Sequence, residues 1–377
     1  KSLGDNPENL IIHGDNLHAL KALLPRYAGN VDCIFIDPPY NTGNENWSYN
    51  DNVNNPIMQE WLSSNPVNKE DMLRHDKWAC MMYPRFKLLH ELLAESGSLW
   101  MTLDDNEIYH ARLLLDDIFG SDNFVATVIW QKKVSPANDA IWFSGDHDYL
   151  MIFAKDKNLW RPNRLERSEG QKSYFTNPDN DPRGPWSSAT YTCNKSKLER
   201  PNLYYPIINP NTGKEVWPSE TAVWRCSKDK HILHEKENCI YWGVDGKATM
   251  PRLKKFLSEV GDIVPRSIWP YTEVGHTQEA TLEFQRFFSK DSFISPKPTR
   301  LINRVLEVAT DEESLVLDSF AGSGTTGHAV LSLNAKDGGN RHFILVECED
   351  YADSVTAERV RRVINGYEYK GTQKEEL

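Results

Sequence analysis

The sequence predicts an α/β fold, a doubly wound and mostly parallel sheet of seven strands that carries an inserted region. Short apolar runs alternate with helix-periodic segments over the first 155 residues, and the same alternation resumes near residue 293. The stretch between them mixes Pro, Asn, Trp and charged residues without a long periodic pattern. The expected strands cover residues 10–13, 31–36, 98–102, 124–130, 149–154, 315–317 and 342–346.

Helical spacing of apolar residues between these strands predicts the helices that cover the sheet. Asp104 and Glu107 resemble a capping box that opens one of these helices, and Gly97 is a stop signal for the helix before it. Residues 41–80 form a polar excursion that is too long for a tight loop, which is typical of functional segments. The expected helices cover residues 16–24, 81–94, 104–119, 299–309 and 351–364.

The change of pattern along the chain predicts three parts. Residues 1–154 and residues 291–377 are expected to form the two halves of one α/β domain, with residues 155–290 inserted between them. The insert is expected to be irregular, built from loops and short strands, with one short helix near residues 251–260.

Size and composition are those of a globular protein, since 39% of the 377 residues are hydrophobic and 11% are aromatic. No run of eighteen apolar residues occurs, and residues 1–9 lack the apolar core of a signal peptide, so no membrane association is expected. The six scattered cysteines predict reduced thiols and a cytoplasmic location.

Charge is distributed unevenly, although the net charge is −11. Residues 151–275 hold 20 lysines and arginines against 15 aspartates and glutamates, whereas the remainder of the chain is strongly acidic. An acidic body with a basic middle segment is compatible with nucleic acid bound by that segment. A charged, solvated surface is the alternative interpretation of the same pattern.

One cluster of residues in the insert contains the side-chain types that ligate zinc. Cys226, His231, His234 and Cys239 lie close in sequence, but their spacing fits no paired CxxC arrangement. The sequence therefore predicts no metal site.

The tetrapeptide from Asp37 to Tyr40 directly follows the apolar run at 31–36. Ligands of open α/β sheets bind at the C-terminal edge of the strands, where this turn is expected to lie. Pro38 and Pro39 fix the backbone, so the turn offers a carboxylate, carbonyl acceptors and one aromatic ring, a combination that suits an exocyclic amine on a flat ring. Taken alone, the turn could also be an ordinary strand exit with a packed aromatic residue.

A second candidate site begins at Asp318 and continues through Phe320, Ala321, Gly322 and Gly324. These residues follow an apolar strand and open a helix, so glycines allow close approach to the backbone and the helix start supplies free N–H groups. The loop lacks the features of a nucleoside triphosphate loop and of a dinucleotide fingerprint.

The strand after this loop ends in Glu347, a carboxylate in the position that suits ribose hydroxyls. Adenosine without phosphates is therefore the favoured ligand of the loop, although a solvent-facing acid at a strand end remains the simpler interpretation of Glu347 alone.

The two motifs together resemble those of the S-adenosylmethionine-dependent amino-methyltransferases of DNA. The tetrapeptide precedes the glycine loop, with the basic insert between them, and this circularly permuted order resembles the β class. Residues 293–299 (FISPKPT) resemble the motif that precedes the cofactor loop in that class, and residues 11–16 (IIHGDN) resemble the strand end that approaches the adenine ring. Residues 37–44 and 200–206 further resemble the modification subunits of type III restriction systems.

This resemblance implies methyl transfer from S-adenosylmethionine to the N6 atom of a flipped adenine in double-stranded DNA, on a class I methyltransferase-like fold. Residues 155–290 would recognise the target. From its length and polarity alone, the polar excursion at 41–80 is expected to order over cofactor or DNA. The implied catalytic residues are Asp37, Pro38, Pro39 and Tyr40, and the implied cofactor-binding residues are Asp15, Asn16, Asp37, Lys297, Thr299, Asp318, Phe320, Ala321, Gly322, Gly324, Thr325 and Glu347.

Several alternatives stay open at this point. Cytosine-N4 methylation uses the same geometry, although Asp at position 37 favours adenine. A catalytically silent DNA-binding module on the same fold is a second alternative, and methylation of RNA or protein is a third. The resemblance leaves a homodimer and a restriction subunit open as partners beside DNA.

Overall fold

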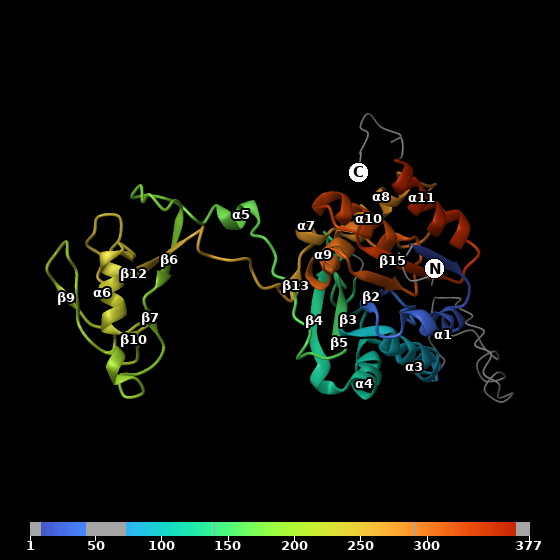
Figure 1. Cartoon of the computed structure of the whole chain (residues 1–377), viewed down its shortest axis with the longest axis horizontal. Helices are drawn as coiled ribbons and strands as arrows, with labels where there is room; N and C mark the ends of the chain where they lie inside the picture. Colours follow the sequence, from blue (N-terminus) through green and yellow to red (C-terminus); the bar gives the residue numbers. More distant parts are fainter. Residues whose placement is uncertain (1–8, 43–72, 139, 290–291, 367–377) are drawn as a thin grey trace. The chain divides into compact units, whose positions relative to one another are not determined.

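The computed structural model describes residues 9–42, 73–138, 140–289 and 292–366. The chain forms two compact units (Figure 1), and each is described by itself. The larger unit contains the chain up to Asn163 and again from Val264 onward, and the smaller unit is Arg164–Ile263. Residues 43–72, which make up most of the predicted polar excursion, lie outside the described residues.

The larger unit is built on an eight-stranded sheet in the order β1-β15-β14-β2-β3-β5-β4-β13. The first five strands are parallel to one another, and β5 is antiparallel to both β3 and β4. The strands are β1 (Leu10–His13), β2 (Val31–Ile36), β3 (Leu93–Leu103), β4 (Phe124–Gln131), β5 (His147–Ala154), β13 (Ile268–Trp269), β14 (Leu315–Asp318) and β15 (His342–Glu347).

Two groups of helices cover this sheet, one on each side (Figure 1). Helices α1, α3 and α4 pack together in one group, and α9, α10 and α11 pack together in the other. The helices are α1 (Asn16–Tyr27), α3 (Arg74–Leu92), α4 (Ile108–Phe119), α7 (Tyr271–Val274), α8 (Thr277–Gln285), α9 (Thr299–Ala309), α10 (Thr325–Asp337) and α11 (Glu358–Asn365), with the short 3₁₀ helix η1 (Ser121–Asn123) and the π-helix η4 (Ala352–Ala357).

Burial explains why the central strands read as unbroken apolar runs. Ile34 of β2, Leu317 of β14 and Ile344 of β15 are completely buried, because helices cover both faces of these parallel strands. The helices in turn bury one apolar stripe each, as Leu301, Val305 and other residues of α9 do. The doubly wound α/β class predicted from the sequence is confirmed.

The smaller unit contains short strands around an aromatic core in which Tyr191, Tyr205, Trp224 and Trp242 are buried. Its sheets are β11-β12-β6, β10-β7 and β8-β9. The elements are α5 (Glu169–Lys172), β6 (Trp186–Thr190), β7 (Thr192–Cys193), η2 (Pro201–Leu203), β8 (Ile207–Ile208), β9 (Glu215–Val216), β10 (Val223–Trp224), α6 (Lys228–Lys236), β11 (Ile240–Tyr241) and β12 (Arg252–Phe256).

The strand count and the limits of the insert differ from the prediction. The eighth strand, β13, has two residues, which is too short for any periodic signal, and it pairs with β4 inside the stretch expected to belong to the insert. The compact smaller unit is also shorter than the predicted insert of 155–290. The Asn163 N–H donates to the Val308 carbonyl at 2.8 Å, which fixes the chain just before Arg164 to the larger unit.

Several helix predictions were also wrong in detail. The helix expected near residues 251–260 is the strand β12, because Arg252–Phe256 pairs with both β6 and β11. Helix α3 begins at Arg74 rather than residue 81, and β3 follows it directly, so Gly97 lies within a strand. The capping box does not form, since the Asp104 carboxylate accepts from the Asn106 N–H while α4 begins at Ile108.

Within the described part of the chain, no helix combines the length and the apolar character needed to cross a membrane.

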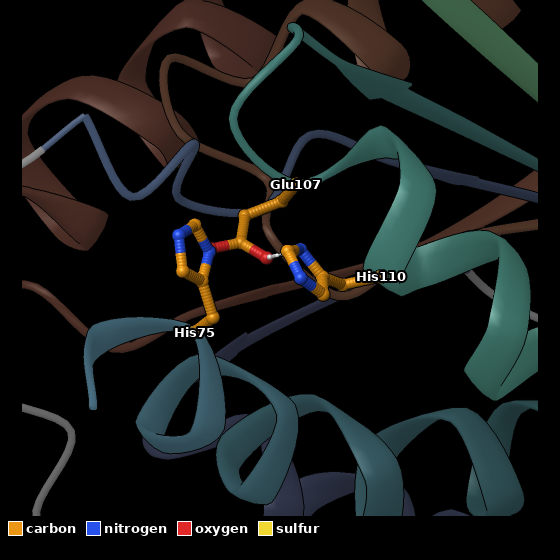
Figure 2. A group of neighbouring side chains, drawn as sticks. All are labelled: His75, Glu107 and His110. Atoms are coloured by element: carbon orange, nitrogen blue, oxygen red, sulfur yellow. Dashed lines mark hydrogen bonds and ion pairs between the residues drawn. The ribbon is translucent and has the colours of Figure 1, made fainter. Parts of the chain in front are cut away.

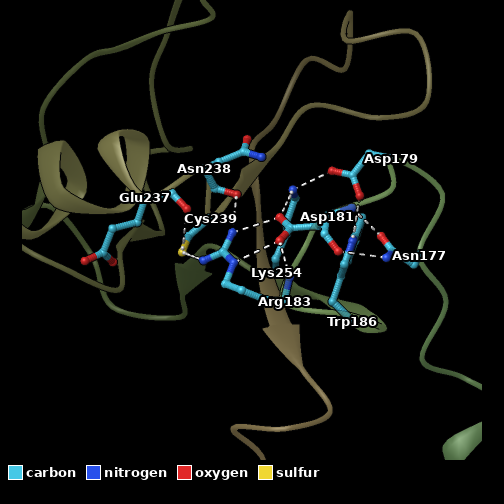
Figure 3. A network of polar contacts seen from close by, with 9 residues as sticks. All are labelled: Asn177, Asp179, Asp181, Arg183, Trp186, Glu237, Asn238, Cys239 and Lys254. Carbon is cyan, nitrogen blue, oxygen red and sulfur yellow. Dashed lines mark hydrogen bonds and ion pairs between the residues drawn. The ribbon is translucent and has the colours of Figure 1, made fainter.

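A buried network of charged residues stabilises the smaller unit (Figure 3). Lys254 Nζ lies 3.0 Å from Asp181 Oδ2 and 2.5 Å from Asp179 Oδ2, and Arg183 Nη2 lies 2.8 Å from Asp181 Oδ2. The side chains of Lys254 and Asp181 are each 1% exposed. Hydrogen bonds from Arg183, together with Lys254, hold the pKa of the Asp181 carboxyl far below its usual range.

We expect Lys254→Ala to lower the free energy of unfolding of the smaller unit by about 3 kcal/mol, because the buried Asp181 would keep only the charge of Arg183 and Asp179 would lose its ion pair. Hydrogen exchange of the β6 and β12 amides in the full chain measures this change. The neighbouring Lys255 is exposed, so Lys255→Ala should change the same exchange by no more than about 0.5 kcal/mol. Equal effects of the two variants would refute a structural role for the network.

Candidate active site

A narrow cleft opens at the C-terminal edge of the sheet, where β14 and β2 end. The two strands are parallel neighbours with Leu317 opposite Ile34, so Asp318 at the end of β14 and Asp37 just after β2 meet at this edge. The predicted site residues that line the cleft are Asp37, Lys297, Asp318, Phe320, Ala321, Gly322 and Thr325. The cleft therefore brings together motifs that are about 280 residues apart in the sequence.

Two neighbouring side chains hold the Asp37 carboxylate. The Thr102 hydroxyl donates to Asp37 Oδ1 at 2.5 Å, and Lys297 Nζ donates to Asp37 Oδ2 at 2.5 Å. Lys297 thereby joins the segment before α9 to the turn after β2. Each carboxylate oxygen of Asp37 still has acceptor capacity, since one bond uses only one of its lone pairs.

The Tyr40 ring lies beside this pair, with Lys297 Nζ 5.1 Å from the ring centroid. The Tyr40 hydroxyl donates a long hydrogen bond of 3.5 Å to Asp148 Oδ2, and Lys132 Nζ pairs with Asp148 Oδ1 at 2.5 Å. Burial, with the Asp37 and Asp148 carboxylates nearby, holds the pKa of the Tyr40 hydroxyl well above its usual range. Tyr40 is therefore a neutral aromatic face at working pH.

Further contacts make the turn after β2 rigid. Pro38 is buried, and the Pro39 carbonyl accepts from the indole N–H of Trp78 at 2.8 Å. Asn41 is completely buried with φ at +58°, a left-handed conformation that Asn tolerates better than most residues. Its side-chain amide donates to Glu107 and, at 3.1 Å, to the Arg74 carbonyl, so α3 and the start of α4 both hold the turn.

The glycine loop turns so tightly that side chains cannot replace its glycines. Gly324 has φ at +77°, and a Cβ atom there would lie 2.8 Å from the Thr356 carbonyl oxygen. Gly322 has φ at +51°, and a Cβ atom there would lie 3.1 Å from the Phe293 ring. Gly324 is also the residue that precedes the first turn of α10, whose free N–H groups face the loop.

Asp318 is a buried carboxyl group at the base of the cleft, 2% exposed. Its oxygens accept from the Phe320 N–H at 3.0 Å and from the Thr326 hydroxyl at 2.5 Å. Burial raises the pKa of Asp318 to about 7, and the charges of Asp37 and Glu347 add to this effect. The group is thus poised to ionise when a cation enters the cleft.

Glu347 lies behind the glycine loop and is not among the residues that line the cleft. Its carboxylate is buried and accepts from the backbone N–H groups of Gly322 at 2.7 Å, Cys348 at 2.9 Å and Glu349 at 3.0 Å. Burial raises the pKa of this carboxyl, while the three N–H donors oppose the shift. In this structure Glu347 stabilises the loop, and its contact with ribose stays a prediction.

Thr299 also lies outside the cleft lining, because a buried network engages it. Its hydroxyl donates to Glu283, and Arg359, which is 1% exposed, donates to Thr299 Oγ1 at 3.1 Å and to Thr325 Oγ1 at 2.9 Å. Arg359 also pairs with Glu283 at 2.9 Å. The network connects α9, α10 and α11 behind the loop.

Asp15 and Asn16 are likewise engaged with the protein. The Asp15 carboxylate caps α1 by accepting from the Leu17 N–H at 2.9 Å. Asn16 is buried, donates to the Ser319 carbonyl at 2.8 Å and accepts from the buried Arg85 at 2.5 Å. Asn16 thus ties the start of α1 to the loop after β14, and neither residue lines the cleft.

Sequence reasoning missed the residues that support the site from outside the two motifs. Thr102 ends a predicted strand, and Asp148 stands just before another, so their positions at strand ends were the only available signal. Phe293 was quoted only as part of a motif, although its ring packs against Gly322. Arg359 carried no signal, because its partners come from three separate segments.

The zinc-type residues of the smaller unit are held by protein groups. The Tyr191 hydroxyl lies within 3.1 Å of Cys226 Sγ and His231 Nδ1 and 3.0 Å from His234 Nδ1. Cys239 instead contacts Arg183 at 3.4 Å, so the four residues do not converge on one point.

Comparison with known proteins identifies relatives over nearly the whole chain. The family model described as DNA methylase, for N6 and N4 methyltransferases, matches residues 31–358. The type III restriction-modification enzyme StyLTI Mod subunit of Salmonella typhimurium is 32% identical over 95% of this chain and 57% of its own length. The EcoPI Mod subunit of Escherichia phage P1 is 32% identical over 92% of this chain and 58% of its own length.

Among solved structures, a putative DNA modification methylase from Thermus thermophilus, complexed with S-adenosyl-L-methionine, aligns with a TM-score of 0.46 and 13% identity over 95% of this chain and 97% of that chain. The chain spans somewhat more than half the length of the Mod subunits that it matches. Because the family match covers most of the sequence, this chain belongs to the DNA methylase family.

Proposed function

We propose that this chain transfers a methyl group from S-adenosylmethionine to the N6 atom of adenine in duplex DNA. The observation that carries the proposal is the single cleft lined both by Asp37 and by the glycine loop from Asp318 to Thr325. A ligand held by the loop would thus present its reactive group to the turn after β2. The Mod subunit relatives support DNA as the substrate, and Asp at position 37 favours adenine as the base.

The chemistry of the cleft fits this cofactor. S-adenosylmethionine, when bound, supplies a methyl group on a cationic sulfonium together with a cationic amine. Asp318 offers a carboxyl group that can balance positive charge, and the glycines at 322 and 324 allow close approach to the backbone. Glu347 is proposed to bind the ribose with acceptor capacity that its three backbone bonds leave unused.

The turn after β2 would activate the amine of the target base. The N6 lone pair of adenine is delocalised into the ring, so the amine is a poor nucleophile. Asp37 and the Pro38 carbonyl would accept its two N–H bonds and localise the lone pair on nitrogen. Asp37 need not be a strong base, because the amine becomes far more acidic as it forms the new bond to carbon. Correct placement supplies much of the acceleration.

Tyr40 is proposed to stack on the flipped adenine, since a base inside a duplex cannot reach such a cleft. Its ring is kept neutral and is oriented by Asp148 at one end. Lys297, which now pairs with Asp37, would leave this position when the base amine enters.

Target recognition is proposed for the smaller unit. Its residues include 16 lysines and arginines against 13 aspartates and glutamates, and it exposes Tyr174 and Trp217. Basic and aromatic side chains suit contacts with phosphates and bases.

In the larger unit, Ile141, Trp142 and Phe143 are exposed together on the loop between β4 and β5. This tip is a second candidate contact with DNA.

Partners other than DNA are proposed from the relatives and from the sequence resemblance. Mod subunits belong to type III restriction-modification enzymes by name, so a restriction subunit is a proposed partner of the protein that contains this chain. A homodimer is a further proposed assembly, which the resemblance to the same enzymes leaves open.

Asp37→Ala should lower the rate of methyl transfer by about 10² to 10⁴-fold, because the amine loses its side-chain acceptor. Cofactor affinity, measured by calorimetry, should change little. Tritiated cofactor and digestion of the labelled DNA to nucleosides provide the activity measurement. Asp122→Ala, at an exposed aspartate of the same unit, is the matched control and should retain full activity.

If the tritium label is found only in N4-methylcytosine, adenine is not the target base and the proposal is overturned. Wild-type protein that neither binds the cofactor nor labels DNA would instead establish a silent DNA-binding module.

Cofactor binding should release protons near pH 7. The pKa of Asp318 is raised to about 7 in the free protein, so the carboxyl is half protonated there, and an entering cation lowers that pKa. Affinity should therefore increase as the pH rises towards about 7 and should level off above it. Calorimetry in buffers of different ionisation enthalpy measures the proton release, and Asp318→Asn should abolish it. An unchanged release in this variant would assign the proton to another group.

A further inference from the structure

Behind the turn after β2, two histidines face one carboxylate (Figure 2). His75 lies in the first turn of α3, Glu107 precedes α4, and His110 lies in the first turn of α4. His75 Nδ1 is 2.7 Å from Glu107 Oε1, and His110 Nδ1 is 3.1 Å from Glu107 Oε2. One ligand atom from each residue lies within 4.8 Å of the others.

The contacts within this His75–Glu107–His110 cluster are incomplete. The Glu107 side chain is completely buried, yet neither Glu107 Oε2 nor His110 Nδ1 makes a hydrogen bond to any of the described residues, although the two atoms face each other. An unsatisfied buried carboxylate oxygen is costly. A group that binds both atoms at once would remove this cost.

We propose that His75, Glu107 and His110 bind a divalent transition-metal ion of the zinc class. Two imidazoles and one carboxylate with a remaining position for water are a common ligand set for zinc. The two rings are partly exposed, at 32% for His75 and 45% for His110, so an ion can reach the buried carboxylate from solvent. The two rings stack with their centroids 4.4 Å apart, and the Nδ1 atom of each lies near a different oxygen of the same carboxylate.

Surrounding residues would hold the metal ligands in place. Asn41 donates to Glu107 Oε1, and a ligating carboxylate is typically fixed by a hydrogen bond of this kind. Arg74 Nε now donates to His75 Nε2 at 3.3 Å. Coordination through Nδ1 places the ring proton on Nε2, so Arg74 would have to turn away when the metal binds.

The ion would act on the turn after β2 through Asn41. Asn41 follows Tyr40 directly, and its left-handed backbone is held by the bond to Glu107. A metal that fixes the Glu107 carboxylate also fixes Asn41 and the residues before it. The site would thus stiffen the turn without touching the bound ligands, and the inference does not depend on the reaction proposed above.

Titration of the metal-stripped full chain with Zn²⁺ by calorimetry tests the site. We expect one bound ion per chain, and affinity weaker by at least about 10 to 100-fold in His75→Gln and in His110→Gln, since losing even an outer contact of a ligand costs that much. His18→Gln, at an exposed histidine of α1 whose Nδ1 atom lies 3.6 Å from Asp15 Oδ1, is the matched control and should bind as the wild type does. Circular dichroism checks that each variant is folded.

Two spectroscopic measurements separate this site from adventitious binding. Co²⁺ bound here should show visible absorption without the near-ultraviolet band of a thiolate ligand, which excludes the exposed Cys80. Zn²⁺ should also slow hydrogen exchange at the amides of Tyr40 and Asn41. The inference is overturned if the wild type binds no ion, or if both histidine variants bind Zn²⁺ with unchanged affinity.

Discussion

The pairing of β14 with β2 is the constraint on which the rest of the site depends. It sets two parallel strands side by side, so the carboxylates of Asp318 and Asp37 emerge at the same edge of the sheet. Two carboxylates at one edge repel each other when both are ionised, and separate neighbouring groups stabilise each of them. Lys297 and Thr102 hold Asp37, while Thr326 and the Phe320 N–H hold Asp318, whose pKa nonetheless stays near 7. The cleft therefore favours a cationic ligand.

Rigidity of the turn after β2 comes from layers that lie outside the motif itself. Proline restricts two backbone angles, but the orientation of the turn depends on Trp78, Thr102 and Glu107, which α3, β3 and the start of α4 provide. The long helix α3 thus contributes to the site although none of its residues lines the cleft. A motif of four residues acts correctly only because three separate elements fix it, which agrees with the general need for outer contacts around reactive groups.

Most of the fold could be predicted from the sequence because the central strands are buried on both faces and the helices bury one stripe each. Ile34 and Leu317 lie in short apolar runs of the kind found in strands that are covered on both faces. The two-residue strand β13 carries no such pattern. The strand β12 was mistaken for a helix because β6, with which it makes its longer pairing, is distant in sequence. At the site, Asp37 and Asp318 were predictable from their strand ends. The engagement of Thr299 with Glu283 and Arg359 was not, since it depends on three-dimensional contacts alone.

The polar and charged groups around the cleft already bind one another, so an entering ligand competes with these internal partners. Lys297 occupies the acceptor of Asp37, and the Gly322 N–H occupies an oxygen of Glu347. A ligand that displaces one of these internal partners must offer an interaction in its place, so the measured affinity is the difference between two sets of interactions. A neutral ligand would leave Asp37 and Asp318 without compensation once Lys297 moved away. A cationic ligand would replace the charge of Lys297 at the same edge, so the sulfonium of the proposed cofactor would compensate these carboxylates when a neutral base amine displaces Lys297.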